Sequence, residues 1–466
     1  MSWWSSRNMP MAINNGKRAH GKIVPGQALP VLRYAHIAGW GKALPERILT
    51  NFDLEAIVDT NDEWIRSRTG IRERRIAADT ESTTQLAVKA AQAALQVANI
   101  LPTDVDLIVV ATSTPEHIFP STASLVQDQL GASHAGAYDL GAACSGFVYA
   151  LDMAAAKIRA GDVDTAVVIG AETMSRVLNW SDRGTCILFG DGAGAVVLKA
   201  SNEPGGLQSS VLRSDGAGWD MLGVPTVGSR DTYLEQHALT RLAAQAESFT
   251  QRVQSLTSTN TTPVATASED EAPERELHRL HMNGREVYKF ATRVVSDSIK
   301  EAVLKSPVEL EDIALIIPHQ ANQRIIDHIA KQLKVSGDKV YSNVAKYGNT
   351  SAASIPIALC EAVEENRIKA GDYFVMTGFG GGLSWATMVF QWSAKPEEEH
   401  KIMDFRRRVI YWYALRRRDW LRFWRNVEWF FGKRDPSQKV KEWRDRLTST
   451  NVGDNPRTTN TDGNKK

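Results

Sequence analysis

Three absences narrow the class of protein before any motif is considered. The 466-residue sequence has three cysteines, Cys144, Cys186 and Cys360, too few and too odd a number for a disulfide framework. It has no run of about 18 apolar residues, the length that a transmembrane helix needs. Its first thirty residues contain no continuous apolar segment, so no secretory signal is expected. The sequence therefore predicts a cytoplasmic protein without a membrane-spanning helix.

The net charge of +1 argues against a general nucleic-acid-binding protein. This charge is unevenly distributed, because residues 395–466 contain 19 Lys and Arg against 11 Asp and Glu, a net of +8. The tail is therefore electrostatically distinct from the rest of the chain. A hydrophobic content of 43% is enough for a large core, which we expect to be formed by two similar halves or two domains.

Short apolar strands alternate with longer amphipathic helices between Arg33 and Ser393, a pattern typical of an α/β fold. Two pairs of segments resemble each other: residues 104–110 resemble 312–318, and residues 161–168 resemble 371–376. Both pairs are separated by a little over 200 residues and occur in the same order. This repetition indicates a duplicated α/β unit.

The predicted domain organisation has four parts. They are an N-terminal arm over residues 1–32, a first half over 33–208, a second half over 209–394 and an extension over 395–466. The second half contains an insertion at about residues 228–280. Within it, Thr232–Leu256 is predicted to be helical, and residues 257–274 are polar, aperiodic and predicted to form a surface loop.

Cys144 is a candidate nucleophile because of its place in the chain. It follows a predicted strand and several small residues, and it precedes a helical stretch that runs to about Ala160. The free amides and the dipole at a helix opening favour the thiolate, which is the nucleophilic form of cysteine. Most free cysteines are buried as small hydrophobic residues, however, and this motif alone favours neither role. Cys186 and Cys360 lie within apolar segments and are expected to be buried.

Three further segments contain residues that could act with Cys144. His319 follows a predicted buried strand, at the end where α/β folds present functional groups, although a lone histidine is more often structural. Asn349 lies in a turn before a helix of small residues, where a capping role is the more common one. The glycines of Gly378–Leu383 would let backbone amides approach a bound oxygen, as an oxyanion hole requires. Gly190–Gly194 lacks the Walker lysine and the dinucleotide spacing, and is interpreted as tight packing.

Together and in this order, the four segments resemble the β-ketoacyl-acyl carrier protein synthase III family of the thiolase superfamily. The resemblance covers about Arg33 to Ser393, apart from the insertion. Its motifs are Asn61-Asp62-Glu63-Trp64-Ile65, Arg68-Thr69-Gly70-Ile71-Arg72, Ala143-Cys144-Ser145-Gly146, Asp182-Arg183-Gly184-Thr185, Pro318-His319-Gln320-Ala321-Asn322 and Gly348-Asn349-Thr350-Ser351. It implies a pseudo-symmetric, five-layered αβαβα core, a homodimer, and an acyltransferase of fatty acid biosynthesis.

The resemblance also implies a reaction. Cys144 accepts an acyl group from acyl-coenzyme A, and the backbone amides of Cys144 and Gly381 hold the oxyanion. Malonyl-acyl carrier protein then binds, and neutral His319 and Asn349 donate hydrogen bonds to its thioester carbonyl. The carbanion that forms as carbon dioxide leaves attacks the acylated Cys144. No metal and no cofactor are implied, because the coenzyme A thioester is a substrate.

Binding residues follow from the same resemblance. The side chains expected to bind coenzyme A are Trp64, Arg68, Thr69, Arg183 and Asn322. Trp64 and Arg183 would enclose the adenine, since an indole and a guanidinium both stack on a flat ring. The acyl pocket is expected to contain Phe119, Met174 and Phe189, with Phe119 reaching in from the partner subunit. Arg324 would contact the acidic carrier protein, although a merely solvated charge is nearly as good an interpretation.

The extension is a departure from this family, whose members usually end near Ser393. At about 100° per residue, most apolar residues between Phe405 and Phe431 fall within about 120° of arc, and most arginines lie outside it. We therefore predict an amphipathic helix over residues 405–431. It would lie either at an anionic membrane surface, as a peripheral contact, or against the enzyme or a partner protein, and the sequence leaves both open.

The sequence also allows alternatives to an enzyme that initiates fatty acid synthesis. The nearest is a synthase III-like condensing enzyme of a secondary, polyketide-type pathway. A papain-type protease also uses Cys, His and Asn, but its Trp-Cys context is absent, and Trp64 and Arg183 would have no explanation. A non-catalytic membrane adaptor conflicts with the presence of all three reactive side chains.

Overall fold

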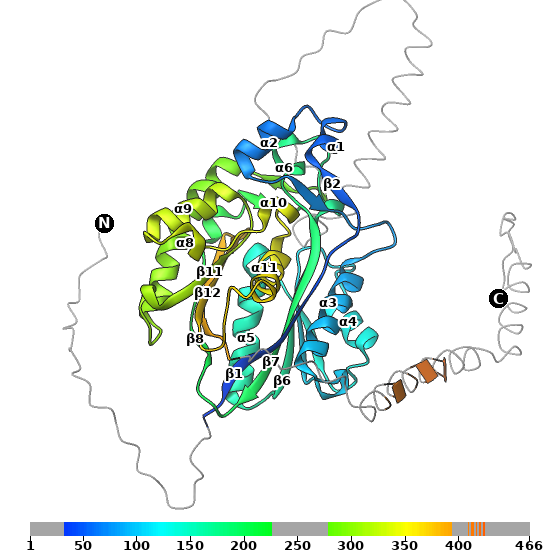
Figure 1. Cartoon of the computed structure of the whole chain (residues 1–466). Coiled ribbons are helices and arrows are strands. Elements are labelled where there is room, and N and C mark those ends of the chain that lie inside the picture. The colour runs from blue at the N-terminus through cyan, green and yellow to red at the C-terminus, as the bar shows by residue number, and fades with distance from the viewer. Residues whose placement is uncertain are drawn as a thin grey trace, which may run out of the picture. The chain divides into compact units, whose positions relative to one another are not determined.

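The computed structural model describes residues 32–225 and 278–393, and eight positions between Val409 and Trp424. The predictions for the N-terminal arm, for the helix at Thr232–Leu256 and for the loop at 257–274 lie outside the described residues. Within residues 32–393 the described part contains two large sheets, each covered by helices (Figure 1).

The first sheet has five strands in the order β1-β7-β6-β4-β5. These strands are β1 (Tyr34–Ala43), β4 (Leu107–Ala111), β5 (Gly136–Leu140), β6 (Thr165–Thr173) and β7 (Asp191–Ser201). β4 runs parallel to both β5 and β6, whereas β7 is antiparallel to β1 and β6. β4 and β6 are buried along their whole length, as their β-branched sequences predicted.

The second sheet repeats this arrangement in the order β11-β12-β13-β8. Its strands are β8 (Gly206–Ser214), β11 (Ile313–Pro318), β12 (Tyr373–Gly380) and β13 (Ser384–Gln391). β11 and β12 are parallel, and β13 is antiparallel to β12 and β8. A parallel bridge from Ile316 to Val340 takes the place that β5 has beside β4. The duplicated unit predicted from the two sequence echoes is thus confirmed by strand order.

The predicted division after residue 208 falls inside β8. All of β8 belongs to the second sheet, so by strand pairing the second half begins at Gly206.

Six helices complete a five-layered αβαβα core. They are α3 (Thr83–Ala98), α4 (Thr122–Leu130), α5 (Gly146–Ala160), α8 (Gly284–Leu304), α9 (Gln323–Leu333) and α11 (Ser354–Glu364). One hydrophobic cluster joins α5 and α11 to strands of both sheets, which places these two helices in the middle layer (Figure 1). A second cluster packs α3 and α4 on the outer face of the first sheet, and a third packs α8 and α9 on that of the second sheet. The predicted fold class is confirmed.

The ends of these helices follow from local sequence. Ser82 caps α3 with a capping box, in which its hydroxyl accepts from the Gln85 amide and the Gln85 side chain accepts in return. α5 ends at Gly161, whose φ of 87° is a conformation that glycine adopts without strain. Between these ends, α5 buries Ala150, Ala154 and other small residues, which lets it lie between two closely spaced sheets.

Shorter elements connect the layers. They are β2 (Ile48–Thr50), β3 (Glu73–Arg75), β9 (Leu222–Gly223), β10 (His281–Met282), α1 (Asn51–Glu55), α2 (Asp62–Thr69), α6 (Arg183–Cys186) and α10 (Val344–Tyr347). Short 3-10 turns are η1 (Pro102–Asp104), η2 (Ala143–Ser145), η3 (Met174–Arg176), η4 (Gly216–Gly218), η5 (Leu310–Asp312), η6 (Gly337–Lys339) and η7 (Ser351–Ala353). β9 pairs with β10, so the chain on the two sides of the insertion is held together.

The eight described positions of the extension are helical, as predicted for this stretch. Six of them are apolar or aromatic with 43% to 65% of their surface exposed: Val409, Trp412, Tyr413, Trp420, Phe423 and Trp424. Their rings contact one another, with Trp420 5.7 Å from Trp424 between ring centroids. No helix in the described part of the chain has the length and hydropathy to cross a bilayer.

Candidate active site

Two structurally equivalent turns, one from each half, hold the centre of the site. η2 leads directly into α5 and contains Cys144, while η7 leads directly into α11 and follows Asn349. The first residue of each turn, Ala143 or Ser351, has a positive φ of 44° or 49°. Such backbone is uncommon for residues other than glycine and is often found at functional sites.

Cys144, His319 and Asn349 all line one cavity of about 550 Å³. Cys144 comes from the first half, whereas His319 follows β11 and Asn349 precedes η7 in the second. The sequence-predicted triad is therefore brought together by the contact between the two halves.

The glycine-rich turn after β12 packs directly against Cys144. A Cβ atom built on Gly380 would lie 2.7 Å from the amide nitrogen of Cys144 and 3.0 Å from its Cβ. One built on Gly378 would lie 2.9 Å from the Cα of Ser145. Only glycine fits at these positions without movement, so the turn brings its own amides close to the sulfur. Gly381, the predicted oxyanion donor, directly follows Gly380 in this turn.

Burial opposes the Cys144 thiolate that the helix opening was predicted to favour. Its side chain is 5% exposed, and burial raises the pKa of the thiol to about 12. The hydrogen bond to Ser351 lowers the pKa of the thiol, but its effect is smaller than that of burial. The nearby Glu172 raises the pKa further. Desolvation of a thiolate in this cavity outweighs the helix dipole. The thiol must therefore lose its proton during the reaction.

His319 is held neutral. It is 1% exposed, and burial lowers its pKa to about 3. Its Nδ1 lies 2.6 Å from the Ser354 hydroxyl, and that oxygen already accepts from the amide of Gln320 at 3.4 Å. The Ser354 hydroxyl can donate its hydrogen to Nδ1, and in that arrangement the imidazole proton lies on Nε2. A neutral Nε2–H group is the donor that the predicted role needs.

The carboxamide of Asn349 is fixed by backbone contacts. Its Oδ1 accepts from the amide of Ser351 at 2.8 Å. Its own amide donates to the carbonyl of Leu188 at 2.8 Å, and its carbonyl accepts from Gly190 at 3.0 Å. Because Oδ1 is already used, the NH₂ group is the part of the side chain left to donate to a ligand.

The predicted adenine clamp is closed in this structure. The guanidinium groups of Arg68 and Arg183 both lie over the Trp64 ring, with their Cζ atoms 4.6 Å and 4.8 Å from its centroid. Arg183 also donates to the carbonyl of Asp59 at 2.9 Å. A flat ring between two stacking partners needs about 7–8 Å between them, so Arg183 has to move before an adenine enters. Trp64 and Arg68 line the cavity, whereas Arg183 does not.

Three other predicted contacts also line the cavity. The Thr69 hydroxyl donates to the carbonyl of Ile65 at 2.7 Å, which makes it a buried part of α2. Asn322 caps α9 and donates to the carbonyl of Arg68 at 3.2 Å, tying α9 to α2. Arg324 lies over the ring of Tyr288, with its Cζ 5.2 Å from the centroid.

Two of the three predicted acyl-pocket residues lie together, and the third lies apart from them. Phe189 lines the cavity, and Met174 packs with it in a small cluster that includes Leu178 and Leu280. Phe119 is 84% exposed and does not line the active-site cavity of the same chain.

Sequence reasoning missed several residues that line the cavity. Arg285, Tyr288 and Lys289 come from the start of α8, where Asn283 caps the helix. Leu222 and Met282, from β9 and β10, add apolar surface. The run Asn283-Gly284-Arg285-Glu286 is a recognisable helix start, but only the tertiary structure brings it to the cavity.

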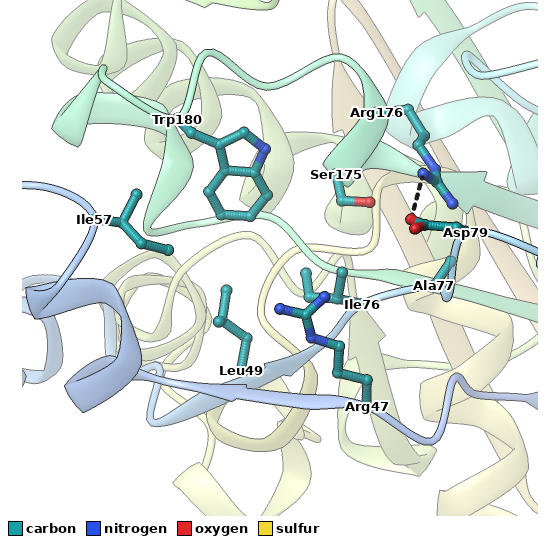
Figure 2. Close-up of a pocket in the computed structure, with 9 residues that line it drawn as sticks. All are labelled: Arg47, Leu49, Ile57, Ile76, Ala77, Asp79, Ser175, Arg176 and Trp180. Carbon is teal, nitrogen blue, oxygen red and sulfur yellow. Dashed lines mark ion pairs between the residues drawn. The ribbon is translucent and has the colours of Figure 1, made fainter.

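A second, smaller hollow of about 230 Å³ shares none of these residues (Figure 2). Its wall includes Trp180 and Arg47, and an ion pair joins Arg176 and Asp79 at 3.6 Å. Figure 2 shows the guanidinium of Arg47 directed toward the middle of this hollow. None of the predicted site residues lies there.

The fold and the cavity define a class of protein. A duplicated αβαβα core, with a cysteine from one half facing a histidine and an asparagine from the other, is that of the thiolase-fold condensing enzymes.

Comparisons with known proteins narrow this class. Residues 138–216 match the family described as 3-oxoacyl-[acyl-carrier-protein (ACP)] synthase III, and residues 304–392 match its C-terminal region. The β-ketoacyl-[acyl-carrier-protein] synthase III of Roseiflexus sp. (strain RS-1) is 45% identical over 361 residues, which cover 78% of this chain and 99% of that protein. The chain therefore belongs to the 3-oxoacyl-[acyl-carrier-protein] synthase III family and is an acyltransferase.

The structure of this chain is also similar to solved structures. The synthase III of Aquifex aeolicus VF5 is 42% identical with a TM-score of 0.65, covering 77% of this chain and all of that one. The priming β-ketosynthase of the R1128 polyketide biosynthetic pathway is 33% identical with a TM-score of 0.67, covering 80% of this chain and all of that one.

Proposed function

We propose that this enzyme joins an acyl group from acyl-coenzyme A to malonyl-acyl carrier protein, and so initiates fatty acid synthesis. Cys144 attacks the acyl thioester, and coenzyme A leaves. The amides of Cys144 and Gly381 stabilise the oxyanion of this step. A single observation carries the proposal: Cys144, His319 and Asn349 line the same cavity, beside a glycine turn that packs on the Cys144 amide.

In the second step the malonyl thioester carbonyl lies against His319 and Asn349. As carbon dioxide leaves, negative charge develops on that carbonyl oxygen, and two neutral donors stabilise it. The imidazole suits this role because burial keeps its pKa near 3, so it donates without carrying a charge of its own. The resulting carbanion attacks the acyl carbon on Cys144, which releases the β-ketoacyl product and frees the sulfur.

Intact-protein mass spectrometry tests the proposal. Incubation with an acyl-coenzyme A is expected to add one acyl mass to the protein, and Cys144→Ala is expected to remove this adduct. Addition of malonyl-acyl carrier protein should then discharge the acyl group as a β-ketoacyl product. Cys360→Ala serves as a matched control, because Cys360 is also buried but lies in α11, outside the cavity. A protein that binds acyl-coenzyme A without forming the adduct would contradict the proposal.

A secondary, polyketide-type pathway is the second candidate. Its support is the 33% identity to the R1128 priming β-ketosynthase, against 45% to the synthase III of Roseiflexus. The two functions differ in the starter group and in the carrier. Competition among acetyl-, branched and longer acyl-coenzyme A donors, with product masses read in one mixture, distinguishes them. A marked preference for a starter other than acetyl or a short branched acyl group would favour the secondary pathway.

We infer that coenzyme A reaches Cys144 along α2 and α8. Trp64 and Arg68 at one side, and Arg285 and Lys289 at the other, give this entrance an aromatic surface and several positive charges. Such charges suit both the phosphates of coenzyme A and an acidic carrier protein. Arg324, which packs on Tyr288 nearby, is the proposed carrier contact. Arg324→Glu should raise the KM for the carrier protein without slowing acylation.

We propose that the enzyme works as a homodimer in the cytoplasm. β5 is the outermost strand of the first sheet, and the exposed side chains of Ile118 and Phe119 lie on a nearby loop. An unpaired strand edge beside an exposed apolar pair favours isologous pairing with a second copy. All three cysteines are free, which suits a reducing compartment. The scheme needs no metal or organic cofactor, since the thioester itself supplies the activated acyl group.

The extension is proposed to lie at an anionic membrane surface. The aromatic side chains exposed on its described helical positions suit the lipid boundary, and the net charge of +8 over residues 395–466 suits anionic headgroups. Flotation with vesicles of anionic lipid should carry the full chain upward. It should not carry a variant truncated after Ala394. Equal flotation of both would point instead to a helix that docks on protein.

A further inference from the structure

A buried carboxylate lies two hydrogen bonds away from the Cys144 sulfur. Glu172 is the next-to-last residue of β6, has no exposed surface, and forms no ion pair within the described part of the chain. An acid in this position is unexpected, because the rest of β6 is a run of small and β-branched residues. Buried carboxylates without a cation are costly and need several donors.

The hydrogen bonds around Glu172 suit an ionised carboxylate, and they oppose the effect of burial, which raises its pKa. The Thr112 hydroxyl accepts a hydrogen bond from the backbone amide of Thr114 at 3.1 Å. The Thr114 hydroxyl accepts one from the backbone amide of Thr173 at 2.9 Å. Both therefore turn their hydrogens to Oε2 of Glu172, at 3.3 and 2.6 Å. The Ser113 amide donates to both carboxylate oxygens at 3.0 Å. Every partner of Glu172 is a donor, as an acceptor-only carboxylate requires.

The same reasoning fixes the direction of the bond to the sulfur. The Ser351 hydroxyl lies 2.9 Å from Oε1 of Glu172, and its single hydrogen is used there. Its oxygen can then only accept from the Cys144 sulfur, 3.5 Å away. The chain of donors therefore runs from the thiol through the Ser351 hydroxyl to the carboxylate, with both hydrogens already pointing toward Glu172.

Within the described part of the chain, Ser351 is the side chain that hydrogen-bonds to the Cys144 sulfur. His319 is a poor base, because burial lowers its pKa to about 3. Burial raises the pKa of Glu172 above its usual value, which makes it a better base than an exposed carboxylate. The Cys144 thiol needs such a base, because its own pKa is about 12.

We propose that Ser351 is a catalytic residue that relays the Cys144 thiol proton to Glu172 when the sulfur attacks the acyl thioester. This inference rests on the proposed function. The S–H bond breaks and its proton moves to the Ser351 oxygen, while the Ser351 hydrogen moves to Oε1 of Glu172. The freed sulfur electron pair forms the bond to the acyl carbon. The proton on Glu172 then returns to the Ser351 oxygen, and the Ser351 hydroxyl hydrogen passes directly to the departing coenzyme A thiolate, which leaves as the thiol.

Ser351 has a second, separable contact. Its backbone amide, not its hydroxyl, holds Oδ1 of Asn349. Ser351→Ala therefore removes the relay and leaves the Asn349 contact in place. Alanine also suits this backbone, because Ala143 has φ 44° at the equivalent position of η2, close to the 49° of Ser351.

The test compares two single-turnover steps in Ser351→Ala and Glu172→Gln. Acylation by acyl-coenzyme A is expected to slow by about 10²–10⁴-fold, the usual contribution of a positioned base. Acyl-enzyme that has been accumulated slowly and then mixed with malonyl-acyl carrier protein should condense within about 3-fold of wild type, because that step has no thiol proton to remove.

Asp191→Asn is the matched control. Asp191 is also a fully buried carboxylate, bonded to Ser175 and the amide of Ala77, and within the described part of the chain it has no hydrogen bond to Cys144 or Ser351. It should leave both rates unchanged per folded molecule, with folding checked by thermal unfolding. Equal slowing of both steps in the relay variants would reduce Ser351 and Glu172 to a structural role. Unchanged acylation would overturn the proposal.

Alkylation of Cys144 by iodoacetamide, located by peptide mapping, separates this inference from the proposed function, because it needs no thioester. The relay predicts that Glu172→Gln slows alkylation. If Glu172 acted only through its negative charge, which raises the pKa of the thiol, its removal would speed alkylation instead. This measurement holds even if no acyl-enzyme forms in the wild type.

Discussion

At the residue scale, Cys144 differs from the two other cysteines only by its neighbours. All three thiols are buried, and burial raises the pKa of each. The Cys144 sulfur, in contrast, donates to the Ser351 hydroxyl, which in turn donates to the buried carboxylate of Glu172. A glycine turn also packs against the Cys144 amide. Reactivity here depends on these contacts rather than on a thiolate stored in the free protein.

Gly380→Ala is expected to reduce acylation by about 100-fold, because the new methyl would lie 2.7 Å from the Cys144 amide and displace the oxyanion donors by a fraction of an ångström or more. Single-turnover acylation measures the effect. Gly337→Ala is the control, since a methyl there meets nothing within 4 Å. Similar rates for the two variants would show that the turn does not shape the oxyanion site.

The low pKa of His319 makes a prediction about stability. Below pH 6.5 the unfolded chain binds a proton at this residue, while the folded chain, with a pKa of about 3, does not. The free energy of unfolding is therefore expected to fall as pH decreases from 6.5 toward 3, by up to about 1.4 kcal/mol per pH unit from this group. Urea unfolding of wild type and His319→Gln across this range measures the difference in slope. If the free energy of unfolding changed with pH by the same slope in both proteins, His319 would not be held neutral in the folded state.

At the element scale, each half contributes one strained turn and the helix that follows it. η2 with α5 and η7 with α11 occupy equivalent places and meet at the centre of the molecule. β6 passes directly behind η7, so the carboxylate at its end reaches Ser351. The site therefore depends on how closely β6 and η7 approach each other.

Gly170→Ala tests this approach. A Cβ at Gly170 would lie 2.2 Å from the carbonyl oxygen of Ala352, which is backbone and cannot turn aside. We expect a loss of about 1–3 kcal/mol in the free energy of unfolding, together with slower acylation as Ser351 moves. Gly136→Ala, where the nearest atom would be 3.9 Å away, should have little effect on either. Equilibrium urea unfolding gives the comparison.

At the scale of the whole molecule, two features within residues 32–393 suit contact with a second copy of the chain. One is the outer edge of β5, and the other is the side chain of Phe119, which is 84% exposed. Both agree with the proposed homodimer, in which each active site receives Phe119 of the other copy.

Tyr138→Lys should weaken that dimer. Tyr138 lies on β5 and is 38% exposed, so pairing of two β5 edges would bring two lysines together. Sedimentation velocity at micromolar concentration is expected to show a larger monomer fraction. Leu304→Lys, an equally large change at the 86% exposed end of α8, should not alter the profile. A wild-type monomer at these concentrations would contradict the proposal.

Much of the architecture was predictable from sequence. The alternation of apolar strands and amphipathic helices, and the repeated segments at 104–110 and 312–318, predicted a duplicated α/β core because side-chain periodicity is a local property. The same local patterns marked Cys144, His319 and Asn349 as candidates, and the family motifs connected them.

Tertiary structure alone decided the rest. The protonation state of Cys144 and the closed stack of Arg183 on Trp64 depend on burial and on contacts between residues far apart in the chain. Glu172 carries no motif, and it reaches Ser351 across 179 positions because β6 lies behind η7. Local sequence specifies what each segment becomes, whereas desolvation and long-range hydrogen bonds arise only when the two halves meet.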